Sequence, residues 1–201
     1  MQRKVFDKIA SGTGALLVVV LLAAGGLLMW GYSFANSSVH DQLAMQQITF
    51  PSKAAFAHAK AGTEITPSMI PSVSQYAGQQ LLTGQQAEAY ANHFIAVHLS
   101  NMPYHGVYSK VSAAARAATP GSAQATNLSA LEATVFQGTT LRGLLLEAYA
   151  FWTIGQVMFW GAIASFAAAL ILALLVGGGV WHARRTTEDT RLFATTAVPA
   201  S

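Results

Sequence analysis

The stretch Gly161–Arg185, GAIASFAAALILALLVGGGVWHARR, has no charge until it ends in His182, Arg184 and Arg185. It belongs to an apolar run that extends from Val157 to Trp181. A helix of that length can cross the roughly 30 Å hydrocarbon core of a bilayer. Aromatic residues flank both ends of the run, as they do at membrane interfaces. This stretch therefore predicts a transmembrane helix over residues 156–181.

A second apolar run covers Ala15–Trp30 and extends to Phe34, with Trp30, Tyr32 and Phe34 clustered at its far end. Overall, 53% of the residues are hydrophobic and only 9% are charged, against roughly 25% charged in ordinary soluble domains. The sequence thus predicts another transmembrane helix over residues 13–34. A cleaved signal peptide is the alternative for this run, because the start is basic and Ser33-Phe34-Ala35 resembles a cleavage site. The run is longer than a usual signal-peptide core, which favours retention.

Basic residues flank the pair of runs on their outer sides. The residues before the first run are Arg3, Lys4 and Lys8, and those after the second are Arg184, Arg185 and Arg191. The long stretch between the runs holds few basic residues, namely Lys53, Lys60, Lys110, Arg116 and Arg142. The positive-inside rule then predicts a cytoplasmic N-terminus over residues 1–12, a cytoplasmic tail over 182–201 and an extracytoplasmic domain over 35–155.

The extracytoplasmic domain is predicted to be helical, so the fold class is an all-α membrane protein with two transmembrane helices. The first helix is expected to continue to about Gln47, and Ser52 is expected to cap a short helix. Residues 85–102 place apolar side chains at helical spacing, namely Ala87, Tyr90, Ala91, Phe94, Ile95 and Leu99. The segment before it, residues 72–84, is predicted to end at Gly84. A weak helix at 108–118 and a linker at 119–127 are expected before a long helix from about Leu128 to Arg184.

The best candidates for metal ligands are His93, His98, Met102 and His105, in NHFIAVHLSNMPYH. Imidazole and thioether together suit copper, and several imidazoles suit zinc. The spacing is unfavourable, because His93 and His98 are five apart and helical metal pairs favour three or four. The alternative is that these are partly buried polar side chains near a helix end. No metal or other cofactor is therefore assigned, and the envelope metal-binding protein remains an alternative function.

Other chemistry has little support in the sequence. Without cysteine, disulfides, thiolate catalysis and cysteine-based metal sites are excluded. No Gly-x-Ser-x-Gly motif or phosphate-binding glycine loop is present. A net charge of +3 without a basic stripe argues against nucleic-acid binding. The sequence therefore predicts that the protein is not an enzyme.

Glu147 lies in LRGLLLEAYAFW, just before the second span, with Arg142 five residues earlier. A carboxylate at the edge of lipid is costly unless it is solvated or paired. Glu147 and Arg142 are thus a candidate ion pair or proton relay. The simpler alternative is an acid that faces water at the outer surface.

Small residues recur along both apolar runs. Those of the second run are Gly161, Ser165 and Ala169 at four-residue spacing, with Ala164 and Ala168 alongside; the first run offers Gly25 and Gly26. Such stripes let another helix approach closely in lipid. Either the two spans pack on each other through these residues, or they dock to a membrane-protein partner or a second copy, and both can hold together.

Three stretches, QQLLTGQQAEAYANHFIAVHLSNM, YSKVS and VFQGTTLRGLLLEAYAFWTIG, resemble a family of small actinobacterial two-span membrane proteins of unknown function. The resemblance implies this architecture and a bacterial cell envelope. Members often carry the label of aromatic ring-opening dioxygenase. That activity needs an iron site of histidine and carboxylate on a soluble fold, which this sequence does not show.

Taken together, these patterns predict a non-enzymatic accessory or scaffolding subunit in the cell membrane. Its partners would be the lipid bilayer and another membrane protein or a second copy. The other function kept open is a ligand-binding sensor or transport accessory. A tail of residues 182–201 is too short for a signalling domain, so that function would need a partner for its output.

Overall fold

The computed structural model describes residues 3–61 and 63–185. Helices account for most of this part of the chain, and its only extended pairing is an isolated antiparallel bridge between Thr49 and Gln80. The chain divides into two compact units, one of Met1–Tyr32 with Gln156–Ser201 and one of Ser33–Gly155. Most of the predicted tail at 182–201, including Arg191, lies outside the described residues.

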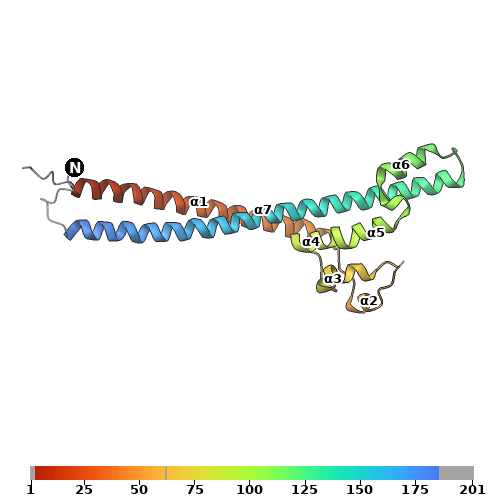
Figure 1. The fold of residues 1–201 in the computed structure, drawn as a ribbon, viewed down its shortest axis with the longest axis horizontal. Helices are drawn as coiled ribbons and strands as arrows, with labels where there is room; N and C mark the ends of the chain where they lie inside the picture. Colours follow the sequence, from red (N-terminus) through yellow and green to blue (C-terminus); the bar gives the residue numbers. More distant parts are fainter. Residues whose placement is uncertain (1–2, 62, 186–201) are drawn as a thin grey trace, which may run out of the picture. The chain divides into compact units, whose positions relative to one another are not determined.

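The first unit is a pair of antiparallel helical segments (Figure 1). They belong to the two longest helices, α1 (Arg3–Gln46) and α7 (Ala123–Arg185). Both helices are long and apolar enough to cross a membrane. In each, only 11% of the most apolar window is buried inside the protein, so most of this apolar surface faces outward.

A seven-residue repeat explains why these two segments stay in contact. The buried and half-buried positions of α1 in this unit include Ser11, Gly14, Val18, Leu21, Gly25, Leu28 and Tyr32. Those of α7 include Met158, Ala162, Ser165, Ala169, Leu172 and Val176. Alternate steps of three and four average 3.5 residues, which keeps one seam of each helix facing its partner as in a coiled coil.

The described residues of the second unit form the end of α1, five shorter α-helices and the beginning of α7. The shorter helices are α2 (Lys53–Ala57), α3 (Ile70–Val73), α4 (Gly84–Tyr90), α5 (Ala96–Asn101) and α6 (Tyr108–Ala117). The 3₁₀ turns are η1 (Pro67–Met69), η2 (Ser74–Tyr76) and η4 (Pro103–Gly106). A π-helical turn, η3 (Ala91–Ile95), joins α4 to α5 without a break.

The predicted helix over residues 85–102 is confirmed, and so is its inward face. Ala87 and Ala91 are fully buried, Phe94, Ile95 and Leu99 are buried, and Tyr90 is half-buried. The π-helical turn inside it was not predicted, because its wider hydrogen bonding leaves no signal in hydrophobic spacing.

The prediction that Gly84 stops a segment is wrong, because Gly84 is the first residue of α4. Thr83 is the N-cap and forms a capping box with Gln86. The Thr83 hydroxyl accepts from the Gln86 amide at 3.3 Å, while the Gln86 side-chain oxygen accepts from the Thr83 amide at 3.0 Å. This reciprocal pair satisfies two backbone donors and starts the helix at this glycine.

Other local predictions have mixed outcomes. Ser52 caps α2 as expected, its hydroxyl accepting from the Ala55 amide, and α6 forms where the weak helix was expected. The linker predicted at 119–127 is too long, because α7 already begins at Ala123. Alanine and glutamine are good helix formers, so this composition extends the helix beyond its amphipathic part.

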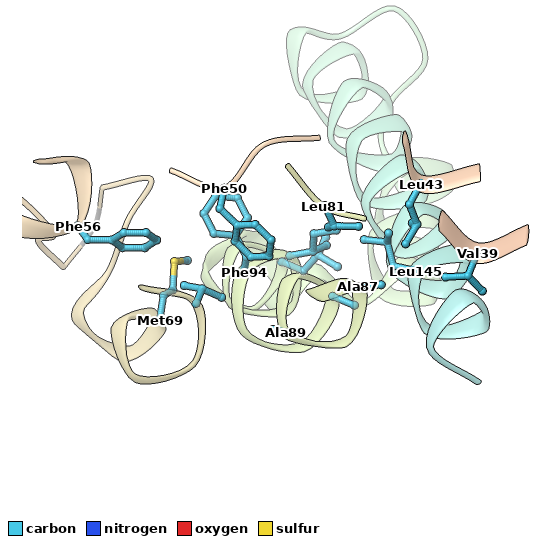
Figure 2. Close-up of a cluster of buried hydrophobic side chains, with 14 residues drawn as sticks. Val39, Leu43, Phe50, Phe56, Met69, Leu81, Ala87, Ala89, Phe94 and Leu145 are labelled. Atoms are coloured by element: carbon cyan, nitrogen blue, oxygen red, sulfur yellow. The ribbon is translucent and has the colours of Figure 1, made fainter. Parts of the chain in front are cut away.

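The core of the second unit lies where the α4–α5 helix meets the loop segments and both long helices (Figure 2). Phe50, Met69 and Leu81 have almost no exposed surface. Phe50 packs edge-on against Tyr90 at a centroid distance of 5.3 Å. The loop is thus held on the helix by large buried side chains, which are the main stabilising contribution in a small domain.

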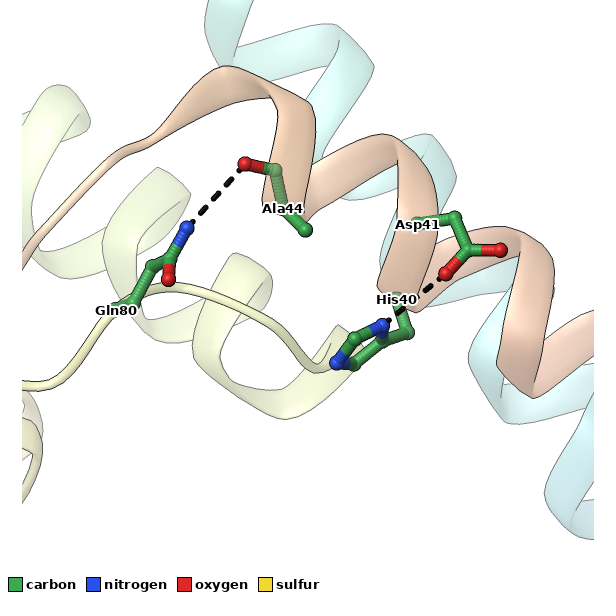
Figure 3. A network of polar contacts seen from close by, with 4 residues as sticks. All are labelled: His40, Asp41, Ala44 and Gln80. Atoms are coloured by element: carbon green, nitrogen blue, oxygen red, sulfur yellow. Dashed lines mark hydrogen bonds and ion pairs between the residues drawn. The ribbon is translucent and has the colours of Figure 1, made fainter.

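One polar contact ties the end of α1 to the following loop (Figure 3). The Gln80 side-chain amide donates to the Ala44 carbonyl at 3.2 Å, which also accepts from the Gln47 amide just after the helix at 3.2 Å. His40 and Asp41 form an exposed side-chain contact at 3.3 Å one turn earlier. The Gln80 contact helps α1 end at Gln46, after which Gln47 adopts a positive φ of 53°.

Candidate functional site

Part of the predicted small-residue set lies where α1 and α7 contact each other in the first unit. A Cβ added at Gly25 would meet the Phe166 ring at 2.7 Å, and one at Gly161 would meet Leu28 at 3.3 Å. Ala169 is buried at 1% exposure and Ser165 is half-buried. These residues pack α1 and α7 on each other within the first unit.

The remaining small residues do not take part in that contact. Ala164 and Ala168 are exposed on α7, and a Cβ at Gly26 would meet nothing within 4 Å. The predicted set therefore divides into an inner face, used between the two helices, and an outer face of Ala164 and Ala168. Sequence spacing alone cannot separate these faces, because neighbouring positions differ only by rotation about the helix axis.

Arg142 and Glu147 are not paired in the described part of the chain. Five residues on a helix correspond to a rotation of about 140° from one another, so the two side chains leave α7 in different directions. Arg142 instead donates from Nη2 to the side-chain oxygen of Asn92 at 2.8 Å. Asn92 in turn donates to Glu88 Oε1 at 2.8 Å. The result is a polar chain, Arg142–Asn92–Glu88, that links α7 to α4 and η3.

A polar pocket of about 560 Å³ opens beside this chain. Its lining comes from α3 with η2, from α4 with η3, and from α7; it includes Gln75, Tyr76, Glu88, His93, Tyr149 and Trp152. The π-helical turn carries both Asn92 and His93, and such turns often occur at functional sites. This pocket brings a predicted candidate, His93, next to residues that the sequence did not single out.

Two aromatic residues of α7 form one wall of the polar pocket. Tyr149 and Trp152 stack with ring centroids 6.1 Å apart and an interplanar angle of 21°. Trp152 packs directly on Gly84, where a Cβ would lie only 2.2 Å from the Trp152 Cβ. Only glycine allows this approach, which explains the residue at the first position of α4 and fixes the backbone of Trp152 beside the pocket.

Glu147 lines a different cavity, an apolar groove of about 500 Å³ between α1 and α7 in the second unit. Most of its lining is apolar and includes Val39, Leu43, Leu145 and Phe151. The Glu147 side chain is exposed, which agrees with the simpler alternative of an acid facing water.

The four metal-ligand candidates are not gathered at one place. His93 lines the polar pocket, whereas His98 and Met102 line a separate pocket of about 370 Å³. His98 Nδ1 lies 2.9 Å from the Phe94 carbonyl, and His105 Nδ1 lies 3.4 Å from the Ser100 carbonyl. Within residues 3–61 and 63–185, no three His, Cys, Asp or Glu side chains are grouped closely enough to hold a metal ion.

The pKa of one core side chain, Tyr90, is clearly shifted. Burial raises the pKa of the Tyr90 phenol above its ordinary value of 10.0, and the negative charge of Glu64 raises it further. Both causes disfavour the phenolate. Tyr90 therefore acts as a neutral aromatic member of the core, packed between Phe50 and Phe94.

The pattern of the sequence does not predict a site role for Asn92, Glu88, Tyr149 or Trp152. A weak signal was available for one pair, because Glu88 and Asn92 are four residues apart and such pairs share a helix face. Arg142 could not have been linked to Asn92 in this way, since they lie 50 positions apart.

No protein-family model, curated protein or solved structure matches this chain.

Proposed function

We propose that the protein is a two-span integral membrane protein with a non-enzymatic role as an accessory subunit. In this proposal both termini are cytoplasmic and the unit Ser33–Gly155 is an extracytoplasmic helical domain. The proposal agrees with the architecture of the small actinobacterial membrane proteins that the sequence resembles.

The exposed surface of the first unit supports lipid as its solvent. Large apolar side chains point away from the helix pair, among them Leu16, Leu27, Trp30, Leu170, Leu174 and Trp181, with exposed fractions between 59% and 69%. A buried core helix would hide such residues, and an apolar area of this kind on a water-soluble hairpin would drive aggregation. A bilayer accommodates it at no cost.

The observation that carries the accessory role is the outer face of α7. Ala164 and Ala168 are exposed four residues apart, while the inner residues Gly161, Ser165 and Ala169 are already used against α1. Small residues at this spacing let a further helix approach closely, which is where packing in lipid gains energy. We therefore assign Ala164 and Ala168 to contact with a helix of another membrane protein or of a second copy.

Site-specific photo-crosslinking in intact cells tests this assignment. A photoreactive residue at Ala168 is expected to give one dominant crosslinked product of defined mass. Ala173 is the matched control, because it is also an exposed alanine of α7 but lies about 140° away around the helix. The pair of substitutions Ala164→Ile and Ala168→Ile is expected to remove the stoichiometric partner from detergent extracts.

The control variant Ala173→Ile should keep that partner, because it adds the same bulk on another face. Equal crosslinking from Ala168 and Ala173, or a monomer without any crosslinked product, would contradict the proposed role.

A further inference from the structure

The polar pocket is an open hollow of the second unit that the proposed docking role does not use. Three separate parts of the second unit form it, and its size of about 560 Å³ is within the range of small-ligand sites. Its surface is mainly polar, in contrast to the apolar groove beside Glu147. A cavity of this kind selects a ligand through a few positioned charges and aromatic surfaces.

Among the described residues that line the pocket, Glu88 is the only Asp, Glu, Lys or Arg. Its Oε1 accepts a hydrogen bond from Asn92 at 2.8 Å, and Asn92 is held from the other side by Arg142. This chain fixes the carboxylate, and neither Asn92 nor Arg142 is among the described residues that line the pocket. The second carboxylate oxygen remains able to accept from a ligand, because an ionised carboxylate has several acceptor positions.

Three aromatic residues are also among those that line the pocket. Tyr149 and Trp152 stack on α7, and Tyr76 lies on η2. The Tyr76 ring is itself packed on Phe50 at 5.2 Å, so its position is fixed by the core. Electron-rich ring faces attract cations, with tryptophan the strongest.

From this combination of one anchored carboxylate and several aromatic rings, we propose that the pocket binds a small organic ammonium group. The carboxylate supplies the counter-charge and the rings replace part of the water around the cation. The group could belong to a soluble amine or to an amine-bearing lipid headgroup, which share this chemistry. The proposal is independent of the docking role at Ala164 and Ala168, because it concerns a different unit and different residues.

Calorimetric titration of the full chain in phosphatidylglycerol nanodiscs tests the proposal. Choline is the probe, and 3,3-dimethylbutan-1-ol is its neutral control of the same shape. Choline is expected to bind with a dissociation constant of about 1 mM or tighter, at least tenfold tighter than the neutral alcohol. Nanodiscs that also contain phosphatidylcholine identify the source: a tenfold weaker apparent affinity for choline indicates a headgroup site, and an unchanged affinity indicates a soluble amine.

The variant Glu88→Gln removes the charge but keeps an oxygen for the Asn92 hydrogen bond. It should bring choline down to the level of the neutral alcohol, and Tyr149→Leu should weaken choline binding at least fivefold. Glu147→Gln, which removes a charge from the other cavity, should leave choline binding unchanged. Equal affinity for choline and the alcohol, absence of choline binding, or full binding by folded Glu88→Gln protein would overturn the proposal.

Discussion

Asn92 receives a hydrogen bond from Arg142 Nη2 at 2.8 Å and passes one on to Glu88 at the same distance. The Arg142 Nε atom is buried and has no hydrogen-bond partner among the described residues, so the guanidinium relies on Asn92. We expect Asn92→Leu to destabilise the second unit by about 2–3 kcal/mol, because it leaves both charged neighbours without this partner. Thermal unfolding in mild detergent measures the loss.

Asn101→Leu is the matched control for this change, because Asn101 is an exposed asparagine at the end of α5. The variant Arg142→Lys should keep the contact with Asn92 only in part, since lysine lacks the planar guanidinium. A destabilisation by Asn92→Leu no larger than that by Asn101→Leu would show that the polar chain adds nothing to stability.

The same substitution is expected to disturb helix packing at one of two consecutive glycines of α1 and not at the other. Gly25→Leu would force its side chain into the Phe166 ring, whereas Gly26→Leu would enter open space. Overpacking of this kind costs about 1–3 kcal/mol, so only Gly25→Leu should separate the helices. The natural chain has no cysteine, which makes disulfide trapping a clean readout.

The reporter pair for that experiment is Ser11→Cys with Gly179→Cys, because a Cβ at Gly179 would lie 3.7 Å from Ser11 Oγ. Efficient oxidation is expected in the reporter alone and with Gly26→Leu added, and reduced oxidation with Gly25→Leu. Identical yields in both glycine variants would rule out the observed packing of this helix pair.

The capping box at the start of α4 gives a local prediction. Thr83→Ala removes the acceptor of the Gln86 amide and is expected to cost about 1 kcal/mol. Thr140→Ala on the exposed side of α7 is the control and should be close to neutral. A lowered unfolding temperature for Thr83→Ala alone confirms the cap as the origin, and equal effects of the two variants would refute it.

Tyr90 is expected to make the second unit less stable as the pH rises in the alkaline range. Its folded pKa is raised above the ordinary value of 10.0, first by burial and then by Glu64. The folded state therefore holds this proton more tightly than the unfolded state. The resulting stability is fully present below about pH 10 and is lost as the pH rises through the folded pKa.

Tyr90→Phe removes that titration and should flatten the fall of the unfolding temperature as the pH rises above about 10. Tyr108→Phe is the control, because Tyr108 is an exposed phenol of α6. If the wild-type and Tyr90→Phe curves run parallel across this range, Tyr90 is not the group responsible.

The proposed orientation predicts which positions an impermeant maleimide reaches in intact cells. A cysteine at Ser109, exposed on α6, should be labelled without lysis. A cysteine at Gly12, near the N-terminus and open to its surroundings, should be labelled only after the membrane is broken. Labelling in the reverse order would place the second unit in the cytoplasm.

Several features of the fold followed from short-range patterns. Two long apolar runs predict two long helices, because nothing in them interrupts helical backbone geometry. The inward face of residues 85–102 followed from apolar spacing, since Ala87, Ala91 and Phe94 recur at helical intervals. The prediction at Gly84 is wrong, because glycine is typical of a helix end, whereas the Thr83–Gln86 capping box starts α4 at this residue.

The site depended on longer-range geometry. The rotation of α7 against α1 decides which small residues pack inward. These are Gly161, Ser165 and Ala169, and not Ala164 and Ala168. The partner of Arg142 is set by the π-helical turn that carries Asn92, 50 positions away. Local sequence fixes the periodicity of a helix, whereas the choice of neighbour depends on packing between segments distant in the chain.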